Sequence, residues 1–189
     1  MAASARRGTP LTPQEIYATA LRLVDTVGVD TLSMRKLAAD LDVNPMSVYH
    51  HVENKTELLR GVCALAGDEI QLPPDDGSPW QDQLRRLARA YRSIARTHPS
   101  LWAYMSSHPE VWDLAAGPLW EVYTRILHMA GVPDDELAHV RKVLYTFVFG
   151  FLTAESNGLL KSLEGDGEPD ETFEIAVDLI VAALERRHS

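Results

Sequence analysis

The residues of this chain that most suggest a binding surface lie in the segment PMSVYHH at 45–51, which reads as a helix of about two turns. A helical wheel gives it an apolar side that can dock on other helices and a side of polar and aromatic groups. Because so short a helix buries little, we expect it to present a surface. The second side carries Met46, Ser47, His50 and His51, with Tyr49 at its edge and Pro45 on the apolar side.

Metal binding and enzymatic catalysis are the other chemistries to weigh. His50 and His51 are adjacent, so their side chains project about 100° apart on a helix and cannot share one ion as an i, i+4 pair can. The remaining histidines lack a matching spacing of cysteines or carboxylates. The sequence has no Gly-rich phosphate loop, no Gly-x-Ser-x-Gly and no Cys-x-x-Cys. We therefore expect no metal, no cofactor and no enzyme activity.

Helices predicted on either side explain how the short helix is held. TPQE at 12–15 is a capping box that starts a helix ending near Gly28, and a second helix runs from about 33 to 41. A tight turn at 42–44 then leads to the short helix, predicted at 44–51. This order is a helix-turn-helix, whose second helix lies in the DNA major groove and reads base edges. A fourth helix follows from Asn54 to about Ile70.

The linker QLPPDDGSP at 71–79 separates two predicted domains, 1–70 and 71–189. Beyond it, helices are expected at about 78–98, 100–107, 110–130, 134–161 and 170–187. No segment shows the alternation of a strand. The fold class is therefore all-α: a three-helix helix-turn-helix domain joined by the fourth helix to a C-terminal helical domain.

Charge and composition narrow the class of protein. The formal net charge is −9, but residues 1–60 hold seven basic and seven acidic side chains, so the whole excess lies in residues 61–189. Bulk attraction to nucleic acid is thus excluded. Cys63 is the single cysteine, which fits a reducing compartment. The first ten residues lack a signal peptide's apolar run, and the uncharged run at 143–154 is too short to span a bilayer. We expect a cytoplasmic protein without a membrane partner.

The segment LSMRKLAADLDVNPMSVYHHVENKTELL, residues 32–59, resembles the DNA-binding domain of TetR-type repressors, and the likeness extends from about Thr12 through Ile70. The segment at 78–99 is similar, more weakly, to the start of the ligand-binding domain in the tetracycline-repressor branch. An ungapped pairing from Trp80 puts Met105 where that branch has a histidine that helps to hold a magnesium–drug chelate. The resemblance therefore does not point to tetracycline as the ligand.

The resemblance implies roles for ten residues in binding operator DNA. Ser33, Met34 and Arg35, which open the second helix, would contact the DNA backbone and sometimes a base. Met34 suits an apolar contact with a thymine methyl group. In the short helix, Pro45, Met46, Ser47 and His50 would face the groove. Tyr49, His51 and Lys55 would contact phosphates, with Lys55 beside a helix N-terminus. In chain order the predicted DNA-binding residues are Ser33, Met34, Arg35, Pro45, Met46, Ser47, Tyr49, His50, His51 and Lys55.

Large apolar side chains of the C-terminal domain could wall a ligand cavity. Four tryptophans occur between positions 80 and 120, although most aromatic residues could equally belong to the core or to a dimer interface. The acidic balance of this domain favours neutral or cationic small molecules. The candidate ligand-binding residues are Tyr91, Trp102, Met105, Trp112, Trp120 and Phe147.

Two apolar segments, 141–155 and 171–187, predict self-association, because one chain is not expected to cover both. Two copies could pack them as a four-helix bundle around a twofold axis; the alternative is that they form the core of a monomer. The predicted dimer-interface residues are Phe149, Phe173, Val177, Ile180, Val181 and Leu184.

Together these observations predict a homodimeric repressor that binds a palindromic operator and is released by an apolar or cationic small molecule. An adaptor of the same fold that has lost DNA binding is the alternative. The presence of Arg35, Tyr49, His51 and Lys55 argues against it.

Overall fold

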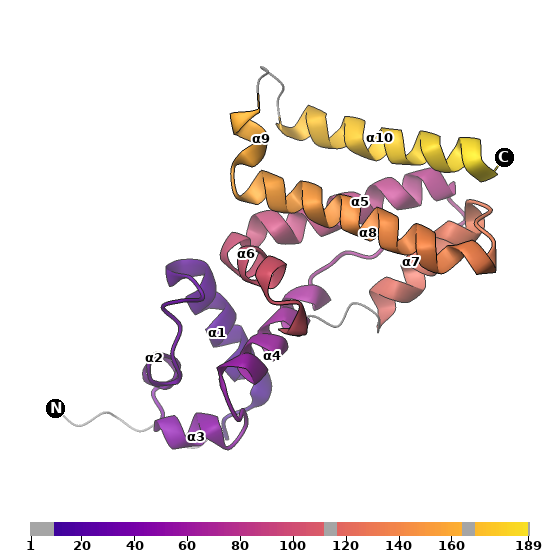
Figure 1. Ribbon diagram of the computed structural model, residues 1–189. Coiled ribbons are helices and arrows are strands. Elements are labelled where there is room, and N and C mark those ends of the chain that lie inside the picture. The colour runs from indigo at the N-terminus through magenta and orange to yellow at the C-terminus, as the bar shows by residue number, and fades with distance from the viewer. Residues whose placement is uncertain (1–9, 112–116, 164–168, 189) are drawn as a thin grey trace. The chain divides into compact units, whose positions relative to one another are not determined.

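The computed structural model describes residues 10–111, 117–163 and 169–188, and within these ranges it contains helices and no strand. The chain forms two compact units (Figure 1). The first unit combines the described residues up to Glu69 with 97–111, and the second combines 70–96 with the described residues from 117 onward. The sequence predicts a division near residue 70 but gives no sign that 97–111 returns to the first unit.

The first unit begins with four helices in the predicted order: α1 (Pro13–Val27), α2 (Met34–Asp40), α3 (Pro45–Tyr49) and α4 (Lys55–Asp68). The capping box of α1 is confirmed, since the Thr12 hydroxyl accepts from the Glu15 amide at 3.2 Å and the Glu15 carboxylate accepts from the Thr12 amide. Gly28, at φ 82°, ends this helix. All described helices are too short or too polar to cross a membrane.

The turn between α2 and α3 sets the direction of α3. Asp42 takes a left-handed backbone conformation, φ 53°, which Asp tolerates better than most residues other than glycine. The side chain of Asn44 then accepts from the Met46 amide at 2.9 Å and caps α3. The helix is shorter than the predicted 44–51: Tyr49 is its last residue and His50 its C-cap.

Helices α1 and α4 pack closely because α4 carries a glycine where they meet. A Cβ atom built on Gly61 would lie 2.3 Å from Cε1 of Tyr17 in α1. No real contact is that short, so this position excludes every larger residue unless the tyrosine ring moves.

The segment 97–111 forms α6 (Pro99–Ser107) and the 3-10 turn η1 (Pro109–Val111), and His98 attaches it to the first unit. The buried His98 ring has Nδ1 2.9 Å from Asp25 of α1 and Nε2 3.2 Å from Glu69, the C-cap of α4. Burial by itself lowers the pKa of His98, but the hydrogen bonds and charges of the two carboxylates outweigh it and raise the pKa above the usual value. The imidazolium thus bridges three segments of the first unit.

The second unit is a helical bundle of α5 (Trp80–Thr97, all but its last residue), α7 (Pro118–Met129), α8 (Asp134–Ser156), α9 (Leu159–Ser162) and α10 (Pro169–His188). Two predicted helices are shorter than expected. The one predicted at 110–130 starts only at Pro118, after Gly117 at φ 99°. The one predicted at 134–161 breaks at Gly158, which is left-handed at φ 79°.

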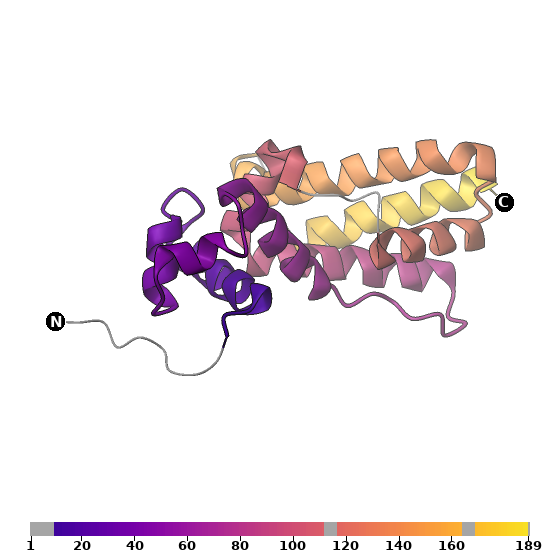
Figure 2. The same cartoon turned by 90° about the horizontal axis from the view of Figure 1, so that it is seen from below.

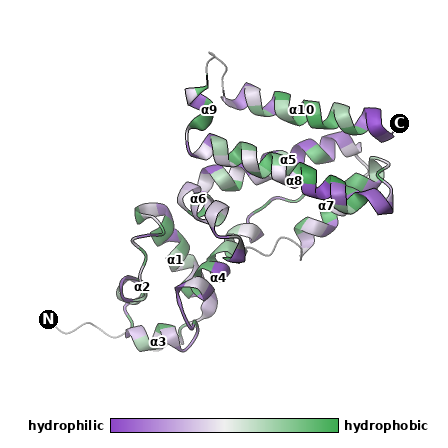
Figure 3. Cartoon of the chain, in the orientation of Figure 1, coloured by the Kyte–Doolittle hydropathy of each residue, from purple (hydrophilic) through white to green (hydrophobic). Residues whose placement is uncertain are grey.

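Within the second unit, α8 and α10 run alongside each other and α5 lies next to them (Figures 1 and 2). Hydrophobic and hydrophilic segments alternate along α8 and α10 (Figure 3). Buried leucines and isoleucines of α5, α7, α8 and α10 form one core. The representative members are Leu84, Leu87, Ile126, Leu127, Leu144 and Leu184.

Four arginines of α5 form a ladder with acidic residues of α10 and α8, which we call the arginine ladder. Arg85 binds Asp178 at 2.9 Å, and Arg89 grips Glu174 with two parallel bonds of 2.7 and 2.8 Å. The set is Arg85, Arg89, Arg92 and Arg96 with Glu155, Asp170, Glu174 and Asp178.

The inner part of the arginine ladder is buried. The side chains of Arg92 and Glu155 are 8% and 13% exposed, and the guanidinium lies 4.3 Å from the Phe173 ring centroid. Burial raises the pKa of Glu155, yet its bonds to Arg92 and Arg96 outweigh this and lower the pKa overall. This pair therefore stays ionised inside the bundle.

The His98 bridge predicts a pH-dependent stability. His98→Gln should lower the free energy of unfolding by about 1–2 kcal/mol at about pH 5.5 and by much less at about pH 8.5. The reason is that a raised native pKa gives stability that is fully present below the unfolded value and is lost as pH rises through the native one. Urea unfolding at both pH values measures it. His139→Gln, at an exposed position, is the control; an equal loss at both pH values would contradict a charged bridge.

Candidate nucleic-acid interface and ligand pocket

Helix α3, the reading helix of the predicted helix-turn-helix, exposes polar and aromatic side chains to solvent. Met46 is 61% and Tyr49 45% exposed, and both His50 and His51 are exposed. On the opposite side Val48 is fully buried, which fixes which face turns outward. Pro45 and Ser47 are partly exposed at the start of the helix. The outward face thus offers Ser47 within the helix and the hydrogen-bonding groups of Tyr49, His50 and His51 at its C-terminal end.

Three of the predicted DNA-contacting residues have structural tasks that the sequence did not reveal. Met34 is 8% exposed and belongs to the core, so it does not offer the expected apolar contact to a thymine methyl. The Ser33 hydroxyl caps α2 by accepting from the Lys36 amide at 3.2 Å. The amine of Lys55 donates to the carbonyl of Val29 at 2.8 Å. Substituting Lys55 would therefore disturb the fold as well as any phosphate contact.

Arg35 is the exposed cation that opens α2 beside the reading helix. Arg22 of α1, by contrast, is held by Asp40 of α2 at 2.6 Å. Arg35 is therefore the more accessible of these two cations.

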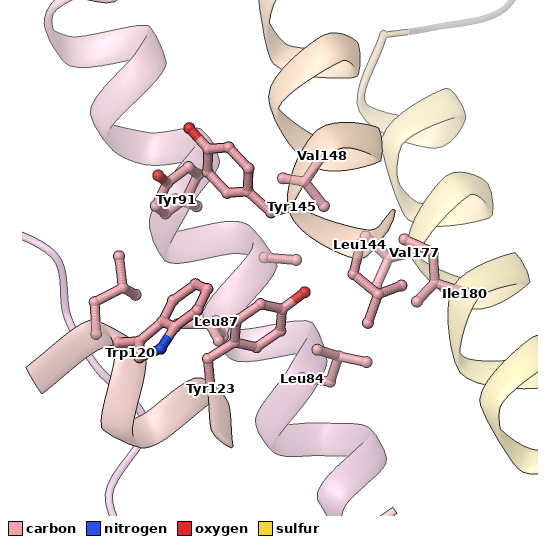
Figure 4. A pocket seen from close by; sticks show the side chains of 12 residues that line it. Leu84, Leu87, Tyr91, Trp120, Tyr123, Leu144, Tyr145, Val148, Val177 and Ile180 are labelled. Atoms are coloured by element: carbon pink, nitrogen blue, oxygen red, sulfur yellow. The ribbon is translucent and has the colours of Figure 1, made fainter. Parts of the chain in front are cut away.

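A cavity lies between four helices of the second unit (Figure 4). About 630 Å³ of space, part of it open solvent, lies between its walls. α5, α7, α8 and α10 each contribute apolar or aromatic side chains. Among the lining residues are Leu87, Tyr91, Trp120, Tyr123, Tyr145 and Ile180.

Two of the six predicted ligand-binding residues, Tyr91 and Trp120, line this cavity. Trp102 and Met105 are buried in the first unit, on α6. Phe147 is half exposed on α8 and is not part of the lining. Trp112 lies outside the described residues. Apolar side chains that face a cavity and those that fill a core have the same sequence signature. The sequence alone therefore does not separate the cavity residues Tyr91 and Trp120 from the core residues Trp102 and Met105.

The cavity contains phenols that stay neutral. Burial raises the pKa of Tyr91 and Tyr123 well above the usual value. Burial also raises the pKa of Tyr145 to about 12, although a hydrogen bond with Tyr91 opposes this. At neutral pH these hydroxyls therefore act as hydrogen-bonding groups and not as charges.

The predicted dimer-interface residues lie mostly inside one chain. Phe173, Val177, Val181 and Leu184 are at most 5% exposed, Phe149 and Ile180 are partly buried, and Val177 and Ile180 line the cavity. The strongest apolar stripe of α10, which the sequence predicts to form the dimer interface, packs against the chain's own core. The apolar side chains that α8 and α10 leave exposed are Val143, Phe147, Ile175 and Leu179.

No group of three His, Cys, Asp or Glu side chains in the described part of the chain is arranged to hold a metal ion.

Comparison with known proteins gives a consistent result for both units. Residues 16–62 match the model of the bacterial regulatory proteins of the tetR family, and residues 84–180, more than half of the chain, match that of the tetracyclin repressor-like C-terminal domain. An HTH-type transcriptional regulator of Saccharopolyspora erythraea is 31% identical over 146 residues, which cover 77% of this chain and 61% of the relative. The chain thus spans less than two thirds of that relative.

Solved structures share the fold over nearly the whole chain. ActR of Streptomyces coelicolor in complex with actinorhodin is 27% identical, with a TM-score of 0.78 and coverage of 96% of this chain and 100% of that one. BioQ, known from Mycobacterium smegmatis, was solved with its natural double-stranded DNA operator; it is 25% identical, with a TM-score of 0.75 and coverage of 93% and 99%. With both units matched, the chain belongs to the TetR family of bacterial regulatory proteins.

Proposed function

We propose that this protein is a DNA-binding transcriptional repressor that works as a homodimer and is released from its operator by a small molecule. The observation that carries the proposal is the capped helix α3, with a buried valine on one side and exposed Met46, Tyr49, His50 and His51 on the other. Exposing these side chains does not stabilise the fold, but it leaves them free to contact bases in a DNA groove. The operator-bound structure of BioQ supports the same use.

Homodimerisation follows from the exposed apolar side chains of α8 and α10. On α8, Val143 and Phe147 are four residues apart and share a face, as do Ile175 and Leu179 on α10. A Cβ atom on Gly150, one turn beyond Phe147, would meet no atom within 4 Å, so the backbone of α8 is accessible there. Two copies related by a twofold axis would cover these faces and pair two reading helices on a palindrome.

Ligand control would use the covalent path between the pocket and the first unit. α5 and α7 supply pocket walls, and the segment between them, 97–111, belongs to the first unit, where His98 fixes it to Asp25 and Glu69. A ligand that favours one position of α5 and α7 would pull on that segment and so on α1 and α4. The protein would have one conformation that binds the operator and one that does not. The ligand can lower the operator affinity only to the extent that it binds the second conformation more tightly than the first.

For DNA binding we expect two kinds of variant. His50→Ala should alter the preference at one base pair by about 1–3 kcal/mol, because it removes a base-reading group. Arg35→Ala should weaken binding to all sequences alike and reduce the salt slope by about one unit. Mobility shifts on fragments retained from genomic DNA at low salt measure both effects. Lys161→Ala, an exposed lysine of the second unit, is the control; failure of the wild-type chain to retain any fragment would count against the repressor.

For dimerisation we expect Leu179→Glu or Val143→Glu to give a folded monomer that no longer binds the palindrome, because a carboxylate would face its own copy across the twofold axis. Sedimentation equilibrium and circular dichroism measure assembly and folding. The matched control is Lys142→Glu, at an exposed position next to Val143 but turned about 100° around α8. A stable wild-type monomer at micromolar concentration would refute the proposed dimer.

For ligand control we expect Trp120→Ala to fold, bind operator normally and lose its response to inducers found by thermal-shift screening, because it removes a pocket wall. Trp102→Ala, at a fully buried position of the first unit, should instead cost about 3–5 kcal/mol of stability. Operator release and thermal unfolding of both variants separate the two roles. An unaltered inducer response in Trp120→Ala would place the ligand elsewhere.

A further inference from the structure

The pocket of the second unit has no charged side chain among its described lining residues. The unit nevertheless contains 16 acidic and 11 basic side chains, in residues 70–96 and 114–189. The reason lies in α5, where the pocket residues Leu84, Ala88 and Tyr91 share one face and the arginine ladder occupies the adjacent one. Charge and pocket are separated on a single helix.

The ladder arginines near the pocket are paired with carboxylates, and Arg141 contacts neutral groups, with its buried Nε left without a hydrogen-bond partner among the described residues. The ladder arginines bind carboxylates of α8 and α10 at 2.5–3.0 Å. Arg141 of α8 lies with its guanidinium 4.4 Å from the ring centroid of Trp120 and donates to the Thr124 hydroxyl at 2.8 Å. A charged ligand would therefore lose its hydration without gaining a counter-ion from the lining residues. This desolvation costs several kcal/mol in an apolar site.

Every polar side-chain group that the lining supplies can donate a hydrogen bond, although the hydroxyls among them can also accept one. These groups are the hydroxyls of Tyr91, Tyr123 and Tyr145 and the indole N–H of Trp120, which can only donate. Figure 4 shows the hydroxyls of Tyr91 and Tyr145 near each other, whereas that of Tyr123 points into the space between the lining side chains. An uncharged acceptor oxygen is the ligand group that this arrangement satisfies.

The walls also select for ring shape. Trp120 and Tyr123 meet edge to face with ring centroids 6.2 Å apart, and with Tyr91 and Tyr145 they present aromatic surfaces from three helices. Flat rings pack on such walls by offset stacking or edge contacts. The apolar side chains of α10, Val177 and Ile180, complete the lining.

We infer that the effector is an uncharged, flat aromatic molecule with a carbonyl-type oxygen that accepts from the Tyr123 hydroxyl. The inference rests on the proposed function in taking this cavity as the effector site. The acidic composition predicts a neutral or cationic ligand. The inference narrows this class to neutral ligands, because no carboxylate is among the described lining residues of the pocket.

Four probes of nearly equal shape test charge and acceptor separately. They are 2-acetylnaphthalene, its hydrocarbon analogue 2-ethylnaphthalene, the anion 2-naphthoate and the cation 1-(2-naphthyl)ethylammonium. Calorimetric titration of the full-length protein should show the ketone binding about two- to tenfold tighter than the hydrocarbon, the worth of one neutral hydrogen bond. Both ions should bind at least about tenfold more weakly than the ketone. Equal or tighter binding of either ion, or binding of none of the four, would overturn the inference.

Tyr123→Phe identifies the donor. It should reduce the ketone-to-hydrocarbon affinity ratio to near one while leaving the hydrocarbon's affinity unchanged, whereas a merely structural defect would weaken both probes together. Tyr104→Phe, on α6 of the first unit and outside the pocket lining, is the matched control and should leave the ratio unchanged. An unchanged ratio in Tyr123→Phe would refute the donor. These titrations contain no DNA, so the pocket can prefer the ketone even if the protein proves not to be a repressor. A failure of this inference is therefore distinguishable from a failure of the proposed function.

Discussion

The pairing of the α5 arginines with carboxylates of α8 and α10 is the interaction on which the second unit depends. It joins three of the four helices that wall the pocket, and its inner pair, Arg92 and Glu155, is almost excluded from water. Removing one partner of such a pair leaves an uncompensated buried charge, so the arrangement tolerates little change. By holding the arginines on one face of α5, the ladder also leaves the neighbouring face free of charge, and that face is the pocket wall.

The first unit depends on a comparable charged contact, the His98 bridge. His98 lies 73 residues from Asp25 and 29 from Glu69 in the sequence, so no local pattern could place them together. For the same reason the return of 97–111 to the first unit was not predictable. Helix caps and the helix-turn-helix were predictable, because the Thr12 capping box, the Asn44 cap and the buried Val48 are local features.

The candidate sites show where sequence reasoning stops. The outward face of α3 was predicted from its periodicity, but Met34 and Lys55 could not be recognised as a core residue and a backbone anchor from their types alone. On α10, the strongest apolar stripe proved to be core, and the weaker pair Ile175 and Leu179 remains outside. One missed signal was readable: the arginines at 85, 89, 92 and 96 and the acids at 170, 174 and 178 both recur at helical spacing.

The central claim is that a symmetric pair of α3 helices binds DNA and that a pocket ligand ends this binding. Footprinting the full-length protein on genomic DNA, with and without an inducer found by screening, tests it most directly. We expect one protected region made of two inverted half-sites about one helical turn apart, and the loss of this protection when the inducer is added. Absence of protection, a single unpaired half-site, or protection that no pocket-binding compound alters would contradict it.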